Sequence, residues 1–196
     1  IYERAMNYAS TAANSESPSD LGGVRFSISG AASLPSRIID PWEARTGGML
    51  VEGYGLTETS PVLTINPLND TRRAGTIGLP LPDTQLRIGD PHDLSRTQPD
   101  GEAGEILARG PQVFSGYLAD APATTAAFHE GWFRTGDMGV REPDGHIRLV
   151  GRIKEIIITG GFNVYPGEVE EALTSHPDIA QAAVVGVPRS DGSAAV

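Results

Sequence analysis

The first part of the chain combines alternating apolar positions with helix signals. In residues 24–29, Val24, Phe26 and Ile28 alternate with polar side chains, which predicts a strand with one buried face. A helix is expected to begin at residues 33–35, with proline in its first turn, and to end at the glycine pair 47–48. The apolar run 49–51 follows. Strand, helix and strand at this spacing predict one βαβ unit in a sheet covered by helices.

From about Gly75 the pattern changes to short apolar runs separated by glycine and proline. Four of these runs are predicted strands: residues 84–88, 104–108, 112–117 and 146–150. Their spacing predicts a small antiparallel barrel or sandwich. One helix is expected to interrupt them, with Asp120 as its cap, Pro122 in its first turn and Phe128 on its buried side.

The last part of the chain again mixes strand and helix patterns. After Gly151, residues 156–159 are predicted as a strand, 166–175 as a helix and 179–187 as a strand. At the other end, residues 1–20 are predicted as a frayed helix followed by a polar linker. The predicted fold class is therefore α/β plus β.

Composition and charge exclude several classes of function. The 196 residues include 25 acidic and 15 basic side chains, for a net charge of -10, and 39% are hydrophobic, enough for a buried core. Lys and Arg do not cluster, so we expect no nucleic-acid partner. The absence of cysteine excludes disulfide scaffolds and cysteine chemistry. No apolar run approaches the roughly 20 residues of a membrane span, and without a signal peptide a cytoplasmic protein is expected.

A glycine-rich segment follows directly after the predicted strand 49–51. Residues 53–61 are GYGLTETSP, and ligands of open α/β sheets bind beyond the carboxyl ends of strands. The Thr57 hydroxyl suits a phosphate oxygen, and the Glu58 carboxylate suits Mg²⁺. A hairpin turn with both side chains in solvent explains the segment equally well, because short glycine-rich motifs often occur by chance.

Two later motifs place charged side chains beside glycines. Asp137 ends the segment GWFRTGD, and a carboxylate can accept both hydroxyls of a ribose, although a turn aspartate bonded to its own backbone is the simpler explanation. Arg152 offers a charged fork for phosphate or ribose oxygens, or it lies in solvent at a domain edge. The Gly160-Gly161 pair predicts a turn whose backbone approaches a ligand or another loop.

Taken in order, these motifs resemble the adenylate-forming enzymes, the family of acyl-CoA synthetases, luciferases and the adenylation domains of peptide synthetases. Residues 29–34 (SGAASL) are similar to the adenine-side loop of the family, with alanine in place of the common proline. Residues 53–58, 104–117 and 134–137 are similar to its core motif, its barrel signature and its ribose-binding step. Residues 151–170 resemble the hinge and the opening of the small C-terminal domain.

The resemblance implies a nucleotide site. Gly30, Ala31 and Tyr54 would frame the adenine, and the implied cofactor-binding set also includes Ala32, Gly53 and Gly55. Thr57 is implied to touch the α-phosphate and Glu58 to hold Mg²⁺. Asp137 would take the ribose hydroxyls, and Arg152 would reach the ribose or phosphate.

The resemblance also implies how the chain divides. Lys154 falls where the family has its hinge residue and completes the implied catalytic set with Thr57, Glu58 and Arg152, while Gly160-Gly161 would line the path of the thiol. The implied parts are listed in order: an α/β remnant of the large AMP-binding domain at 1–72, a β-barrel-like subdomain at 73–150, a hinge at 151–154 and the start of a small α+β C-terminal domain at 155–196.

The implied activity is activation of a carboxylic acid by ATP through acyl-AMP, followed by thioester formation with coenzyme A, with Mg²⁺ as the metal. Lys154 and residues 161–166 are more similar to acyl-CoA synthetases, so a medium- or long-chain fatty acid is expected. The family's phosphate loop and catalytic lysine would lie outside the 196 residues, so we expect a piece of a longer protein. The alternative is a non-catalytic nucleotide-binding fragment, and no oligomeric state is assigned.

Overall fold

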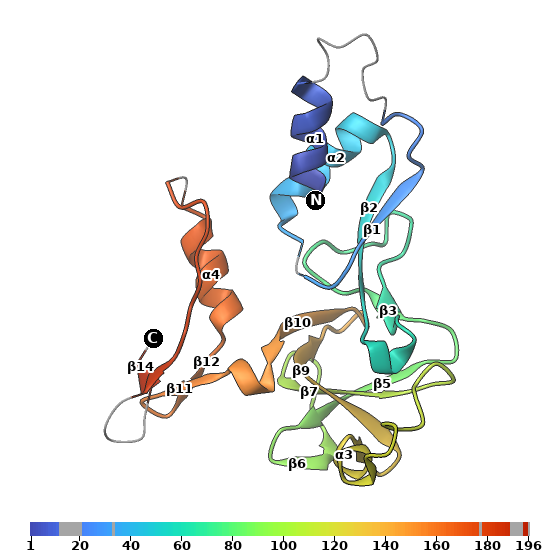
Figure 1. The fold of residues 1–196 in the computed structure, drawn as a ribbon, viewed down its shortest axis with the longest axis vertical. Helices are drawn as coiled ribbons and strands as arrows, with labels where there is room; N and C mark the ends of the chain where they lie inside the picture. Colours follow the sequence, from blue (N-terminus) through green and yellow to red (C-terminus); the bar gives the residue numbers. More distant parts are fainter. Residues whose placement is uncertain (12–20, 33, 177, 189–193, 196) are drawn as a thin grey trace. The chain divides into compact units, whose positions relative to one another are not determined.

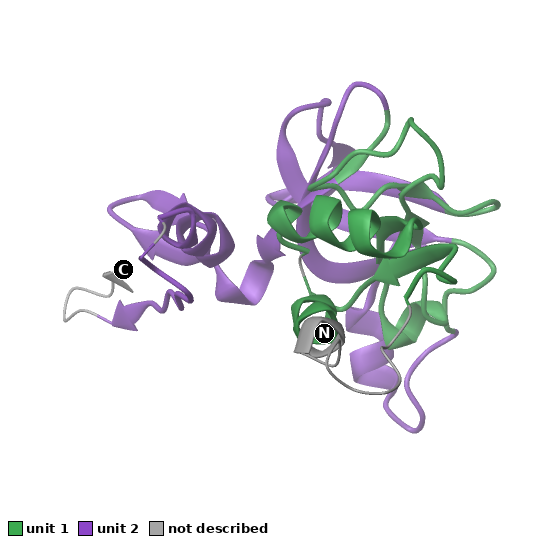
Figure 2. Cartoon of the chain, turned by 90° about the horizontal axis from the view of Figure 1, so that it is seen from above, with its two compact units in different colours: residues 1–84, 110–114, 145–147 green, residues 85–109, 115–144, 148–196 purple. Residues whose placement is uncertain are grey.

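The chain folds into two compact units. The computed structural model describes residues 1–11, 21–32, 34–176, 178–188 and 194–195. Figure 1 shows its helices and strands, and Figure 2 colours the units: residues 1–84, 110–114 and 145–147 form the first, and 85–109, 115–144 and 148–196 form the second. The polar linker expected before residue 21 lies almost entirely outside the described residues. Over the described ranges, no helix combines the length and apolar character needed to cross a membrane.

The first unit is built on the predicted βαβ arrangement, which is confirmed. Strands β1 (Phe26–Ser29) and β2 (Met49–Tyr54) pair in parallel. The 3-10 turn η2 (Ser36–Ile38) and helix α2 (Ile39–Thr46) connect them. The helix ends at Gly47, whose φ of 74° is left-handed and suits a residue without a Cβ.

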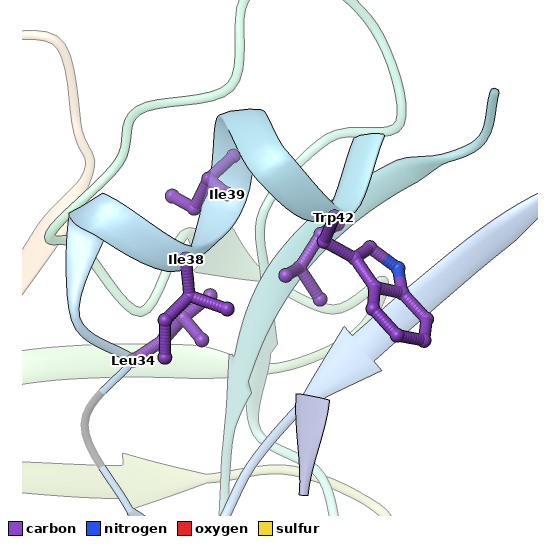
Figure 3. Close-up of a cluster of buried hydrophobic side chains, with 5 residues drawn as sticks. Leu34, Ile38, Ile39 and Trp42 are labelled. Carbon is purple, nitrogen blue, oxygen red and sulfur yellow. The ribbon is translucent and has the colours of Figure 1, made fainter. Parts of the chain in front are cut away.

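An apolar cluster holds α2 against the sheet. Its buried members are Leu34, Ile38, Ile39, Trp42 and Leu50, which Figure 3 draws as sticks. Ile39 and Trp42 lie one and four residues after Ile38, a spacing that places all three side chains on one helix face. The indole nitrogen of Trp42 donates to the Ser27 hydroxyl at 3.0 Å, so its polar atom is satisfied. Helix α1 (Tyr2–Thr11) adds the ring of Tyr2, edge-on to Trp42 with centroids 4.8 Å apart.

An ion pair joins α2 to the chain that follows strand β3 (Thr64–Ile65). Glu43 accepts the Leu50 amide at 2.7 Å through one carboxylate oxygen and an Arg72 nitrogen at 2.7 Å through the other. The hydrogen bond from Arg72 lowers the pKa of Glu43. Strand β4 (Leu79–Pro80) completes the sheet in the order β1-β2-β3-β4.

The second unit contains a nearly closed antiparallel sheet, as the spacing of the short apolar runs predicts. The strand order is β10-β9-β7-β5-β6, and β8 pairs with β9. The strands are β5 (Gln85–Asp90), β6 (Asp93–Thr97), β7 (Ala103–Arg109), β8 (Phe128–His129), β9 (Trp132–Arg141) and β10 (Ile147–Arg152). Strands β6 and β9 were not predicted, because polar residues in the first and glycines in the second interrupt the apolar alternation.

Helix α3 (Ala121–Ala126) begins as predicted at Asp120, whose carboxylate accepts the Ala123 amide at 2.9 Å. The expectation that Phe128 lies on this helix is wrong, because Phe128 begins β8. Its ring packs against Phe133 of β9, with centroids 5.8 Å apart.

Two predicted strands are absent from the described part of the chain. Residues 112–117 form no strand, because the amide of Phe114 donates to the carbonyl oxygen of Glu58 at 2.8 Å instead of to a neighbouring strand. Residues 179–186 form no strand, and β13 (Val187–Pro188) begins only at the end of the predicted range. The amide of Val184 bonds to the Glu170 carboxylate at 2.9 Å.

The remaining elements of the second unit are η4 (Ile153–Glu155), β11 (Ile157–Thr159), β12 (Phe162–Val164), α4 (Pro166–Thr174), β13 and β14 (Ala194–Ala195). Of these, β11 and α4 agree with the predicted strand 156–159 and helix 166–175, whereas the others were not predicted. Ile156 and Tyr165 pack against the buried residues Met138, Val140 and Val150 of the antiparallel sheet. The predicted boundaries at 72, 150 and 154 stay predictions.

Candidate functional site

The two parallel strands of the first unit end side by side, and β1 continues into a loop that contains glycine. Ser29, the last residue of β1, pairs with Glu52, so the loop that begins at Gly30 runs beside Gly53. A Cβ on Gly30 would lie 3.4 Å from the Gly53 carbonyl oxygen. Ala31, in the same loop, has a φ of 66°. The two segments predicted to surround an adenine, residues 30–32 and 53–55, are therefore adjacent.

Packing of the chain on itself accounts for the glycines that flank Tyr54. A Cβ on Gly55 would lie 1.7 Å from the carbonyl oxygen of Pro61, and one on Gly53 would lie 3.2 Å from that of Thr64. Gly55 therefore requires glycine whether or not a ligand binds, while a side chain at position 53 would be tightly packed. Tyr54 between them is half-buried at the end of β2.

The turn η3 (Thr57–Thr59) carries the predicted phosphate and metal ligands. Thr57 is exposed and Glu58 is half-buried. Thr59 is fully buried, and its hydroxyl accepts the Leu56 amide at 2.9 Å and lies 3.0 Å from the carbonyl oxygen of Pro61. Sequence reasoning missed Thr59, which lies three residues after Leu56, the residue that precedes the turn.

Glu52 is a second residue that sequence reasoning missed. Its carboxylate accepts the Leu34 amide at 3.1 Å, which joins β2 to the far end of the loop that begins at Gly30. Burial raises the pKa of Glu52. Together with Asn66 and Arg72 it lines a cavity of about 310 Å³ in the first unit.

In the second unit, Asp137 and Arg152 lie together. Asp137 belongs to β9 and is 5% exposed, and Arg152 is the last residue of β10. The Nε of Arg152 lies 3.4 Å from the Asp137 carboxylate, and the guanidinium side chain is 56% exposed. A buried carboxylate thus faces a cation that reaches solvent, which is a suitable pair for a polar, anionic ligand.

Lys154 and the glycine pair lie further along the second unit. Lys154 is exposed in the middle of η4. Gly160 and Gly161 form the turn between β11 and β12 with φ values of 57° and 84°. A Cβ on either glycine would meet nothing within 4 Å. The predicted turn is confirmed, and the approach of its backbone to a ligand or another loop stays a prediction.

Glu58 has the chemistry of a magnesium ligand. Among the described residues, no three His, Asp or Glu side chains form a group that could hold a metal ion by themselves. Mg²⁺ usually keeps several waters and binds one or two carboxylates together with substrate phosphates. One half-buried carboxylate fits that mode of binding.

Comparison with known proteins defines the class to which this fold and these residues belong. Residues 1–118 match the family model of the AMP-binding enzyme, and residues 168–196 match that of the AMP-binding enzyme C-terminal domain. The first match alone covers more than half of the chain. The chain therefore belongs to the AMP-binding enzyme family.

Curated relatives are CoA ligases. The chain is 41% identical over 177 residues to a long-chain-fatty-acid–CoA ligase of Yersinia pestis, covering 90% of the chain and 31% of the relative. It is 43% identical over 171 residues to one of Bacillus subtilis, covering 87% and 30%. It is 44% identical over 170 residues to an indoleacetate–CoA ligase of Aromatoleum aromaticum, covering 85% and 32%. The chain thus spans about a third of the length of these relatives.

Solved structures confirm the fold. The crystal structure of ATP-bound MatB from Rhodopseudomonas palustris matches 99% of this chain and 41% of that one, with a TM-score of 0.83 and 33% identity. The anthranilate CoA ligase AuaEII in complex with anthranoyl-AMP matches 93% and 35%, with a TM-score of 0.78 and 30% identity.

Proposed function

We propose that this chain forms part of an acyl-CoA ligase, which activates a carboxylic acid with ATP and then joins the acyl group to coenzyme A. The observation that carries the proposal is the buried Asp137 carboxylate facing the exposed Arg152 guanidinium at 3.4 Å. A carboxylate can accept two ribose hydroxyls, and a guanidinium matches phosphate or ribose oxygens. ATP in the MatB structure and the names of the relatives support the same activity.

The adenine would lie at the end of the parallel strands. Residues 30–32 and 53–55 line this edge, where Gly30 and Gly53 approach each other. Tyr54 offers a flat ring for a base. Carboxyl ends of parallel strands are the usual place for a nucleotide in open α/β sheets, which supports this assignment over a plain hairpin turn.

The first half-reaction breaks the bond between the α-phosphate and pyrophosphate. A carboxylate oxygen of the substrate attacks the α-phosphorus, pyrophosphate leaves, and acyl-AMP forms. Negative charge builds on the phosphate oxygens, so the Thr57 hydroxyl would donate to the α-phosphate and Arg152 would supply positive charge. Mg²⁺, held by Glu58 when bound, would neutralise phosphate charge.

The second half-reaction requires access for the thiol. The sulfur of coenzyme A attacks the acyl carbonyl carbon, and AMP leaves. We assign Lys154 to a hinge whose rotation would bring the Gly160-Gly161 turn to the path of the thiol. The position of Lys154 in the short connection between β10 and β11, and the left-handed φ values of both glycines, support this assignment.

A medium- or long-chain fatty acid is the proposed substrate. The relatives in Yersinia pestis and Bacillus subtilis are named long-chain-fatty-acid–CoA ligases. Relatives named for indoleacetate and sulfoacetate reach 44% identity, so overall identity does not by itself select the acid. A panel of acids of increasing chain length would identify it.

Titration of ATP into the full-length protein tests the nucleotide site. Asp137→Asn removes one carboxylate oxygen and the charge, so ATP should bind at least about tenfold more weakly, the effect of losing a hydrogen bond to a charged group. The matched control is Asp100→Asn, which removes the charge of the partner of Arg141 (2.6 Å), the last residue of β9, and should leave ATP affinity unchanged. Equal affinity in wild type and Asp137→Asn would refute the site.

A second candidate applies to the 196 residues by themselves, which would bind nucleotide without catalysis. Their coverage of only 31% of the Yersinia pestis relative supports it. On this proposal the isolated chain shows no acid-dependent exchange of pyrophosphate into ATP. Measurable exchange with any fatty acid would overturn it.

A further inference from the structure

Glu105 is a buried charge to which the proposed chemistry gives no role. It lies in β7 and is 2% exposed. A carboxylate in such a position is expensive unless charged and polar partners surround it. Its partners all belong to the stretch of β9 that leads to Asp137.

The ladder between β7 and β9 is interrupted at this point. Glu105 pairs with Met138 and Leu107 pairs with Arg134. Two steps along β7 therefore correspond to four steps along β9, which leaves residues 135–137 with two residues more than the ladder can pair. This bulge contains Asp137, and Gly136 within it has a left-handed φ of 73°.

Side chains replace the backbone bonds that the bulge loses. Oε1 of Glu105 accepts the Gly136 amide at 3.2 Å. Oε2 accepts Nε and Nη2 of Arg134 at 3.3 and 3.0 Å. The Thr135 hydroxyl donates to the carbonyl oxygen of Ile106 at 2.8 Å and accepts the Asp137 amide at 3.1 Å. Both carboxylate oxygens of Glu105 are thus hydrogen-bonded, one to Arg134 before the bulge and one to Gly136 within it.

We propose that Glu105 is the positioning residue of the ribose site. Its carboxylate hydrogen-bonds to both Gly136 and Arg134 and so fixes the bulge in the conformation in which the Asp137 carboxylate faces Arg152 and the ribose hydroxyls. The inference rests on the proposed nucleotide site and adds to it the residue that holds its carboxylate in place. Geometry of this kind decides how well a ligand is held, because small displacements weaken hydrogen bonds steeply.

The substitution Glu105→Gln separates this role from simple packing. Glutamine has the same shape, but its side chain has one acceptor oxygen and one donor nitrogen. It can therefore accept from Gly136 or from Arg134, and not from both. In the double variant Glu105→Gln/Arg134→Gln, the side-chain NH2 of residue 105 can donate to the side-chain oxygen of residue 134, and its oxygen can still accept the Gly136 amide. Both hydrogen bonds of residue 105 are thereby restored.

The readout is the preference of the full-length protein for AMP over 2′-deoxy-AMP, measured by calorimetric titration. Glu105→Gln should weaken the binding of AMP about tenfold and that of 2′-deoxy-AMP much less, because the contact that is lost is with the ribose hydroxyls. The double variant should regain most of the preference. Asp100→Asn, which breaks the exposed pair with Arg141 on the same strand, should keep the wild-type preference.

Each other outcome has a distinct meaning. A wild-type protein that binds neither nucleotide would overturn the proposed site itself. Wild-type binding, with Glu105→Gln weakening both nucleotides equally and lowering the melting temperature, would reduce Glu105 to a structural residue and overturn the positioning role. If Glu105→Gln does not fold, Arg134→Met replaces it: a preference reduced about threefold is expected from the loss of one charged hydrogen-bond partner, and an unchanged preference overturns the proposal.

Discussion

Thr57 and Thr59 lie two residues apart in one turn, and the structure leaves the first exposed and buries the second. Thr59 is 0% exposed, and its hydroxyl accepts the Leu56 amide at 2.9 Å. Thr59→Val preserves shape and removes the hydroxyl, which leaves that amide without its acceptor. Thr57 is exposed, so Thr57→Val is a matched control for stability.

The magnitude follows from the bond that is lost. A buried donor without a partner costs about 1–3 kcal/mol, and because the Leu56 amide is only partly buried we expect roughly 1.5 kcal/mol for Thr59→Val. Thr57→Val should change the free energy of unfolding by less than about 0.5 kcal/mol, yet weaken ATP by removing the proposed α-phosphate donor.

Urea denaturation and ATP titration of the two variants, both in the full-length protein, check this assignment. Thr59→Ser, which restores the hydroxyl, should recover most of the lost stability. If Thr57→Val is destabilised as much as Thr59→Val, or if Thr59→Val unfolds like the wild type, the hydrogen-bond account of the turn is refuted.

Two further predictions concern a buried carboxyl and the hinge. Because burial raises the pKa of Glu52, the folded chain binds this proton more tightly than the unfolded chain, and wild-type stability falls as the pH rises from the unfolded carboxyl pKa, about 4.3, through the raised folded value. The stability of Glu52→Gln relative to wild type should therefore increase with pH over that window in urea titrations, and a constant difference would contradict the burial argument. At the hinge, Lys154→Pro fixes φ near about −65° and should impair one half-reaction far more than the other, whereas Lys154→Ala should leave both nearly unchanged. An equal loss of pyrophosphate exchange and of thioester formation in Lys154→Ala would assign the side chain itself to the site.

Local signals predicted much of the fold. The end of α2 at Gly47 and the start of α3 at Asp120 are decided by hydrogen bonds within four residues. The parallel pairing of β1 and β2 follows from the length of the helical connection between them. Segment 112–117 was mispredicted because the amide of Phe114 bonds to Glu58, far earlier in the chain.

The residues of the candidate site likewise divide into those that local motifs indicate and those that depend on long-range contacts. The resemblance to adenylate-forming enzymes selected Asp137 and Arg152, which the structure places together. Glu105 and Glu52 were not predicted because their partners are distant in sequence. Arg134 lies 29 residues from Glu105, and Leu34 lies 18 residues from Glu52. A buried glutamate has no local sequence signature, since its environment exists only after the strands have paired.

Acid-dependent exchange of labelled pyrophosphate into ATP is the most direct test of the central claim. In the full-length protein, exchange should require a carboxylic acid, increase toward medium- and long-chain fatty acids, and fall at least about tenfold in Asp137→Asn at ATP concentrations below saturation. Asp100→Asn should retain the wild-type rate. Exchange that is absent with every acid, or that is the same in wild type and Asp137→Asn, would contradict the assignment of Asp137 and Arg152 to an acyl-adenylate-forming site.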